Sequence, residues 1–172
     1  MTPDAIIEKL KARHGDAILA VDPSPKHPFV KVAPAKWREV ATTLRDELGM
    51  NYLVCLTAID RGPELEAFYH LEHIGGLRGP RTGESPGGVG DARWGIGVRV
   101  LVPRENPVIP SVEDVWRTSD WHEREAWDLM GIKFEGHHNL VRILCAEDWE
   151  GHPLRKDYKS PDYYHGVKNN VV

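Results

Sequence analysis

The sequence predicts an α+β protein in which a mainly antiparallel sheet has helices packed on one face and an extended C-terminal arm follows the sheet. Segments 65–71 and 96–102 alternate apolar and polar residues with a period of two, which is typical of strands with one solvated face. Segments 3–14 and 34–48 have apolar residues at helical spacing. From Glu147 onward neither period is present, and Pro, Gly, Asp, Asn, Lys and Tyr are frequent.

The N-terminal part is predicted to be a helix followed by two strands. The helix is short: Thr2 is its cap, Pro3 its first helical residue and Gly15 its terminator. Segments 17–21 and 29–32 are apolar and flank a turn that is rich in proline, so they are predicted to be strands joined by that turn.

The central part is predicted to be a second helix followed by three strands. Segment 52–58 is apolar at both parities, as expected of a central strand, and the alternating segments 65–71 and 96–102 are predicted to pair as a long hairpin. Segment 75–95, rich in glycine, is predicted to be the mobile loop of this hairpin. The apolar residues of helix 34–48 fall within an arc of about 100°, which indicates a helix lying on a core: Trp37, Val40, Ala41, Leu44 and Leu48.

Two short helices, 112–117 and 121–130, are predicted after the sheet. Each follows a capping-box pattern, Ser111 with Asp114 and Asp120 with Glu123. We therefore predict a folded α+β domain over residues 1–146 and an extended, partner-binding C-terminal arm over 147–172. Such an arm has no periodic apolar face of its own and would become ordered on a partner.

Composition excludes several classes of protein. With 22 Lys and Arg against 26 Asp and Glu, and a net charge of -4, the chain has no basic excess for binding nucleic acid. The two cysteines, Cys55 and Cys145, form no CxxC pair, so the sequence predicts no disulfide framework, zinc finger or cysteine-held iron–sulfur cluster. This cysteine content indicates a reducing compartment. The longest nearly apolar run, 52–59, is too short to be a transmembrane segment, and the N-terminus resembles no targeting sequence.

Short motifs for catalysis or cofactor binding are weak. Residues 83–87 match G-x-S-x-G, but Pro86 follows the serine and has no N–H for an oxyanion hole. The glycines form neither a dinucleotide fingerprint nor a phosphate loop. His137, His138 and His152 lack helical ligand spacing, so no catalytic, cofactor-binding or metal-ligating residue is assigned; a metal-dependent hydrolase using them is the alternative from another functional class.

The segment 121–130 presents a polar residue to a core. On a helical wheel Glu123 lies within the apolar arc of Ala126, Trp127, Leu129 and Met130, whereas Arg124, Glu125 and Asp128 lie outside it. Because a buried carboxylate needs compensation, we expect Arg142 or Arg155 to pair with Glu123. Trp121 and Trp149 are predicted either to form a contact surface or to be covered by the arm.

Three stretches together resemble a known family. They are His122-Glu-Arg-Glu-Ala-Trp-Asp-Leu-Met-Gly-Ile-Lys-Phe-Glu-Gly-His137, Arg142-Ile-Leu, and Glu147-Asp-Trp-Glu-Gly-His-Pro-Leu-Arg-Lys-Asp-Tyr158, with 102–116 preceding them. Together these stretches resemble the 30 kDa subunit, also called the C subunit, of the proton-pumping NADH-quinone oxidoreductase, which is respiratory complex I. The resemblance implies an α+β subunit of the hydrophilic arm whose motif residues are structural or interface positions: Trp121, Glu123, Arg124, Glu125, Asp128, Gly136, His137, Arg142, Glu147, Trp149, Gly151, His152, Pro153, Arg155, Lys156, Asp157 and Tyr158.

The resemblance also implies the partners and the location. The chain would be a non-catalytic structural subunit without a cofactor, packed against the quinone-site (D) subunit, the terminal iron–sulfur (B) subunit and other hydrophilic-arm subunits. FMN and iron–sulfur clusters in partner subunits would pass electrons from NADH to quinone, coupled to proton translocation. The chain would be peripheral on the cytoplasmic face of the bacterial inner membrane. The alternative is the equivalent subunit of a related membrane-bound complex that uses ferredoxin, another reduced carrier or hydrogen.

Overall fold

The computed structural model describes residues 2–22, 28–74 and 94–169. The predicted proline-rich turn, most of the predicted glycine-rich loop and the G-x-S-x-G motif lie outside these residues. The described elements are α1 (Pro3–His14), a 3-10 turn (Gly15–Ala17), β1 (Ile18–Asp22), β2 (Phe29–Val32), a second 3-10 turn (Pro34–Lys36), α2 (Trp37–Asp46), β3 (Tyr52–Asp60), β4 (Glu64–His73), β5 (Trp94–Pro103), β6 (Val108–Pro110), α3 (Ser119–Met130), β7 (Lys133–Glu135), β8 (Tyr163–Tyr164) and β9 (Val167–Lys168).

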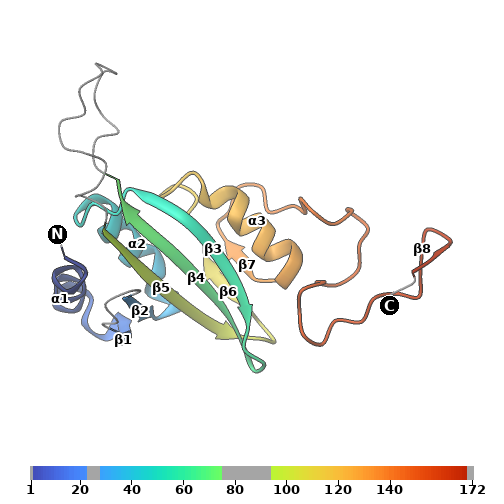
Figure 1. Ribbon diagram of the computed structural model, residues 1–172, viewed down its shortest axis with the longest axis horizontal. Helices are drawn as coiled ribbons and strands as arrows, with labels where there is room; N and C mark the ends of the chain where they lie inside the picture. The colour runs from blue at the N-terminus through green and yellow to red at the C-terminus, as the bar shows by residue number, and fades with distance from the viewer. Residues whose placement is uncertain (1, 23–27, 75–93, 170–172) are drawn as a thin grey trace, which may run out of the picture.

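A five-stranded sheet in the order β1-β2-β5-β4-β3 forms the centre of the molecule (Figure 1). The neighbours β1/β2, β5/β4 and β4/β3 are antiparallel, and only β2 and β5 pair in parallel. β4 and β5 form the long hairpin that their alternation predicts, with Leu71 opposite Ile96 and Leu65 opposite Val102. The predicted α+β fold with a mainly antiparallel sheet is therefore confirmed.

β3 is the strand whose position was predicted wrongly. It is apolar at both parities, yet it lies at the edge of the sheet rather than in the centre. Only one of its faces is in the core: Leu53 is buried, whereas Tyr52 and Val54 are 40% and 37% exposed. α3 runs beside this edge (Figure 1), so the apolar residues of β3 serve a helix contact as well as the sheet.

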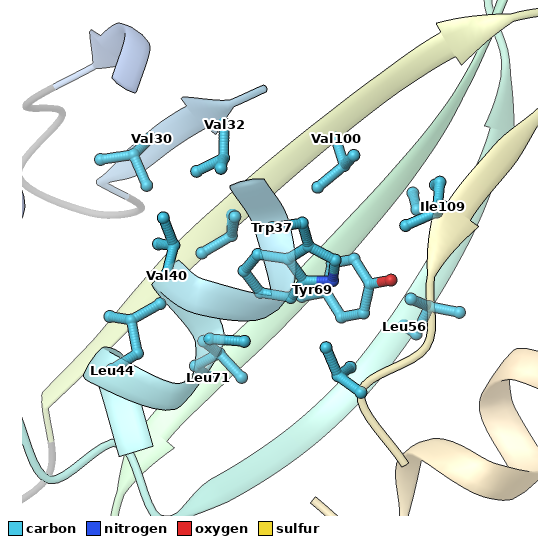
Figure 2. Packing of buried hydrophobic residues seen from close by; sticks show 14 of the residues in the cluster. Val30, Val32, Trp37, Val40, Leu44, Leu56, Tyr69, Leu71, Val100 and Ile109 are labelled. Atoms are coloured by element: carbon cyan, nitrogen blue, oxygen red, sulfur yellow. The ribbon is translucent and has the colours of Figure 1, made fainter. Parts of the chain in front are cut away.

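The core lies between the sheet and α1 and α2. α2 presents the predicted residues Trp37, Val40, Ala41 and Leu44 to the inward face of β4 and β5, and all four are fully buried. In Figure 2 the Trp37 ring lies against Tyr69, and their ring centroids are 4.4 Å apart. Since burying a large apolar side chain contributes about 1.5–3 kcal/mol, this face of α2 is a main source of the domain's stability.

The predicted helix over 112–117 is absent, because these residues form turns instead. Val115 and Trp116 both donate their N–H groups to the Val112 carbonyl, and the chain does not continue into a helix. The two predicted capping boxes are also wrong. Ser111 donates its hydroxyl to Glu123 instead of capping a helix, and α3 begins after Thr118, which makes no capping bond with its side chain.

The C-terminal part contains two stretches with different contacts. Residues 152–157 make hydrogen bonds with the domain. Residues 159–169, which include the short β8–β9 hairpin, extend away from it (Figure 1). The proposed boundary between residues 146 and 147 remains a prediction. Among the described helices, none combines the length and the apolar character that crossing a membrane requires.

Candidate subunit interface

α3 organises the region that carries most of the predicted interface residues. The helix ends at Gly131, whose φ of 75° is left-handed and whose N–H donates to the Trp127 carbonyl, a glycine terminus of the usual kind. One face of α3 joins the core through Ala126 and Met130, and the carboxylate of Glu123 is buried with that face. Asp128 is also buried, but on the other side of the helix, under the segment 143–145. The predicted burial of Glu123 is confirmed. Asp128 does lie outside the apolar face, but it is buried all the same, because another segment of the chain covers it.

Glu123 is compensated by neutral donors and not by an arginine. Its carboxylate accepts the hydroxyls of Ser111 and Ser119, each at 2.6 Å, and the Val112 N–H at 2.9 Å. Burial raises the pKa of Glu123, and these three hydrogen bonds offset the rise only in part. The predicted pairing with Arg142 or Arg155 is wrong because both arginines hold groups at the other end of α3. Glu123 instead ties the turn before α3 to the helix.

Asp128 is the acceptor for the segment that leaves β7 toward the arm. Oδ2 accepts three successive backbone N–H groups at 2.8–3.1 Å, from Ile143, Leu144 and Cys145. Oδ1 accepts a hydrogen bond from Nη1 of Arg142 at 2.6 Å. Burial alone would raise the pKa of the Asp128 carboxyl, but these donors outweigh it and lower the pKa to about 2. A side chain expected to face solvent thus anchors an irregular segment.

Arg142 extends this anchor to the next turn of the chain. Its Nη2 donates to the carbonyls of Trp149 at 2.8 Å and Gly151 at 3.0 Å, while Nη1 stays on Asp128. A planar guanidinium can hold several acceptors in a fixed geometry, which a lysine cannot do. Arg142 therefore fixes the loop that contains the exposed Leu144 relative to α3.

The turn at 152–155 closes the C-terminal end of α3. Nδ1 of His152 lies 3.0 Å from the Asp128 carbonyl, the Leu154 N–H donates to the Leu129 carbonyl at 3.0 Å, and Nε of Arg155 donates to the Met130 carbonyl at 2.7 Å. The last carbonyls of a helix have no partner within it, and here the arm supplies the donors. Burial lowers the pKa of His152, which favours the neutral ring.

Asp60, at the end of β3, holds the arm from the sheet side. Its carboxylate accepts from Nη1 of Arg104 at 2.7 Å, from the Gly62 N–H at 2.8 Å and from the Lys156 N–H at 2.9 Å. The hydrogen bond from Arg104, followed by that from Lys156, holds the pKa of Asp60 well below its usual range. Arg104 also pairs with Asp157. Sequence reasoning missed Asp60 and Arg104, since nothing local relates them to residues near 156.

Large apolar side chains are exposed on α3, on the segments that these anchors hold, and on residues 159–169. Trp121 is 63% exposed with the Arg124 guanidinium 5.1 Å from its ring, which confirms one of the two tryptophans as a surface residue. Trp149 is instead partly covered by the arm, with its ring centroid 5.0 Å from that of Tyr164. We call the exposed set the arm surface: Trp121, Val141, Leu144, Leu154, Tyr163 and Val167.

Comparisons with known proteins agree on one family. The family model described as the 30 kDa subunit of the respiratory-chain NADH dehydrogenase matches residues 30–164. The chain is 40% identical over 169 residues to the C subunit of NADH-quinone oxidoreductase from Chlorobium phaeobacteroides, covering 95% of this chain and 93% of that protein. It is 39% identical over 163 residues to the same subunit from Chloroherpeton thalassium, covering 92% of this chain but 62% of that longer protein. The chain belongs to the 30 kDa subunit family of the respiratory-chain NADH dehydrogenase.

Solved structures are similar to this family member over most of its length. A trypsin-resistant fragment (1-134) of Nqo5 matches with a TM-score of 0.63 and 25% identity, covering 81% of this chain and 100% of the fragment. The membrane-bound sulfane sulfur reductase, an archaeal respiratory membrane complex, contains a chain that matches with a TM-score of 0.70, covering 91% and 85%. At 18% identity the second likeness concerns the fold. The predicted resemblance to the 30 kDa subunit is confirmed.

The structure brings together only part of the residues predicted for the family motif. Those around the C-terminal end of α3 converge on Asp128 and, for Arg155, on the Met130 carbonyl: Arg142, Trp149, Gly151, His152 and Arg155. Lys156 and Asp157 follow on the side of Asp60 and Arg104, and the Tyr158 N–H donates to the Arg155 carbonyl. Glu125 and Glu147 are exposed, Pro153 is partly buried in the 152–155 turn, and Gly136 forms a left-handed turn after β7. His137 is at the other end of α3, with Nε2 3.2 Å from the Asp120 carbonyl.

Proposed function

We propose that this chain is a non-catalytic structural subunit in the hydrophilic arm of an NADH-quinone oxidoreductase. In such a complex FMN and iron–sulfur clusters in partner subunits pass electrons from NADH to quinone, coupled to proton translocation. Membership of the 30 kDa subunit family supports the assignment to the complex. The observation that carries the structural role is the arm surface, which exposes large apolar side chains on α3, on the segments that polar anchors hold against it, and on residues 159–169.

A structural role also agrees with how the shifted carboxylates are used. Asp60, Glu123 and Asp128 have shifted pKa values, a property that often marks catalytic groups. Here they are 6%, 0% and 0% exposed, and each one accepts hydrogen bonds from the chain itself. They hold backbone segments in place and offer no face to a substrate. These contacts support a role in positioning the arm.

The proposed partners are the quinone-site (D) subunit and the terminal iron–sulfur (B) subunit. Residues 159–169 run away from the domain and expose Tyr163 and Val167, 62% and 70% accessible, which suits an extended contact on another protein. Through these partners the chain would be peripheral on the cytoplasmic face of the bacterial inner membrane.

The second candidate is the equivalent subunit of a related membrane-bound complex with another electron donor. We keep this second candidate because a chain of the membrane-bound sulfane sulfur reductase, an archaeal complex, has the same fold. The fold alone carries no information about the electron donor, which binds elsewhere in either complex.

Isolation from native membranes tests the proposal. The full chain, tagged at its N-terminus, should co-purify with the quinone-site and terminal iron–sulfur subunits and with the FMN- and NADH-binding subunits, as identified by mass spectrometry. A chain ending at Tyr158 should lose most of this material, and so should the double variant Y163S/V167S. L19S is a matched control, since Leu19 is 54% exposed on β1 outside the arm surface.

Recovery with ferredoxin- or hydrogen-linked subunits would favour the second candidate, and recovery of the chain alone would contradict both.

A further inference from the structure

Four potential metal ligands from three segments converge at the N-terminal end of α3. Glu113 lies in the turns before the helix, Asp120 in its first turn, and His137 and His138 follow β7. One ligand atom from each residue lies within 4.8 Å of all the others. Sequence spacing did not reveal this group, because the carboxylates and the histidines are brought together by the docking of separate segments. We propose that these four side chains form a binding site for a divalent transition metal of the zinc class.

The distances around His137 fit a four-coordinate ion. Nε2 of His137 lies 3.4 Å from Oε2 of Glu113 and 3.3 Å from Oδ1 of Asp120. Zinc–nitrogen and zinc–oxygen bonds of about 2.0–2.2 Å place tetrahedral ligand atoms about 3.4 Å apart. Nδ1 of His138 is closer to Oε2 of Glu113, at 2.6 Å, and makes a hydrogen bond that an ion would replace. The His138 side chain is 64% exposed, so it can move outward by the distance that this replacement requires.

Two features show that the inner part of the site is already arranged. The His137 side chain is fully buried, and its ring stacks on that of His138 with centroids 5.3 Å apart. Oδ1 of Asp120 is a buried atom that accepts no hydrogen bond, so an oxygen facing Nε2 of His137 has an open valence for a cation. Two histidines and two carboxylates would bring two negative charges to a divalent ion, which leaves the filled site neutral.

Binding costs further hydrogen bonds at His137, the one between Nε2 and the Asp120 carbonyl at 3.2 Å and the one that Nδ1 accepts. The Asn139 N–H donates to Nδ1 of His137 at 3.1 Å, which places the ring proton on Nε2. Coordination through Nε2 moves the proton to Nδ1 and breaks this hydrogen bond. Asn139 is exposed, so water can replace its partner. Because four protein ligands fill a tetrahedral site and leave no position for a reactive water, the metal would be structural, holding 137–138 against 113–120.

The test is a titration of the full, metal-free chain with Co²⁺ and then Zn²⁺. We expect one equivalent of Co²⁺ to give the intense visible spectrum of a four-coordinate ion, which Zn²⁺ abolishes. H138Q and E113Q should each weaken binding at least about tenfold, since even partners outside the ligand shell cost that much. H165Q is the matched control: Nε2 of His165 lies 2.6 Å from Oδ2 of Asp148, a second exposed histidine–carboxylate pair in another place.

Thermal unfolding separates an effect of a variant on metal binding from an effect on stability. His138 is exposed, so H138Q should unfold without metal at the temperature of the parent chain, which circular dichroism checks. Binding of Zn²⁺ should raise that temperature in the parent and in H165Q but not in H138Q. The absence of a one-to-one Co²⁺ complex, or equal binding by the parent and H138Q, would overturn the proposal. Neither result bears on co-purification with the other subunits.

Discussion

Individual carboxylates decide how the irregular part of this chain is held. Glu123 and Asp128 are both buried on α3. Glu123 is compensated mainly by two hydroxyls, with one backbone N–H, and Asp128 by an arginine and three backbone N–H groups. Hydroxyls can reverse their donor direction, whereas N–H groups and a guanidinium cannot. The two positions should therefore respond differently to the same loss of charge.

The first prediction compares D128N with E123Q. In D128N the amide NH₂ must face either Arg142 or the three backbone donors, so we expect a loss of about 3–5 kcal/mol in the free energy of unfolding. In E123Q the serine hydroxyls can turn to accept from the amide, so the change should stay below about 1.5 kcal/mol. Urea unfolding measures both. E125Q, on the exposed face of the same helix, is the control and should change the free energy of unfolding by less than about 0.5 kcal/mol. Equal losses in D128N and E123Q would contradict the assignment of donors.

The second prediction concerns acid. The pKa of Asp128 is lowered to about 2 and that of Asp60 is also lowered, so both carboxyls hold their protons more weakly in the folded chain. Their stabilisation is therefore complete above the unfolded pKa of about 4 and is lost as the pH falls through the folded values. For Asp128 this amounts to about 2 kcal/mol. Urea unfolding between pH 5 and 2 should show the loss, and its slope should be smaller in D128N.

At the scale of elements, the arm donates hydrogen bonds to the last carbonyls of α3, and α3 in turn holds the chain before the arm through Asp128. Gly131 is the point of contact: a Cβ on this residue would lie 2.5 Å from Nη2 of Arg155 and from Cδ2 of His152. The close approach of the 152–155 turn to the helix terminus thus requires glycine for space as well as for its φ of 75°. Helix and turn should lose stability together.

The third prediction separates these two requirements by comparing G131A with G136A. Gly136 has a similar φ of 85°, but a Cβ there would meet no atom within 4 Å. G136A should therefore cost only the backbone strain, about 1–2 kcal/mol. G131A should cost at least about 1 kcal/mol more, because it also displaces His152 and Arg155. Urea unfolding gives both values, and trypsin should cut after Arg155 sooner in G131A alone; equal stability of the two variants would mean that the turn does not dock.

At the scale of the whole molecule, the contacts divide the predicted arm into a bound part and a projecting part. Lys156 and Asp157 are tied to the sheet through Asp60 and Arg104, whereas Lys159 and Lys168 lie beyond the last of these anchors. Sequence reasoning placed the change near Glu147, where periodicity ends. The last of these contacts with the sheet is at Asp157, while Tyr164 and His165 hydrogen-bond to Asp148, and the boundary at 146/147 stays a prediction.

The fourth prediction follows from this division. In the free chain, trypsin should cut after Lys159 and Lys168 before it cuts after Arg155 or Lys156, since cleavage requires local release of the backbone. In the assembled complex all four positions should be protected. Mass spectrometry of timed digests reads both states. Early cleavage at Arg155 in the free chain would contradict the docking of 152–157, and unchanged cleavage at Lys159 in the complex would contradict a partner contact there.

What the sequence determined by itself is the part of the fold that periodicity encodes. The faces of α2, β4 and β5 were predicted because alternation and helical spacing report which side chains are buried. The motif between residues 122 and 158 was also sufficient to identify the family. Both kinds of information are local or linear in the chain.

Tertiary structure decided what no local pattern contains. β3 is apolar on both sides like a central strand, but its place at the edge depends on which strands pair and on α3 lying beside it. Asp128 has a polar side chain on a helix, and only the arrival of residues 142–145 makes its burial favourable. Asp60 and Lys156 meet across 96 positions. A buried charge is stable only where donors from distant segments converge on it, and the packing of the whole chain determines that convergence.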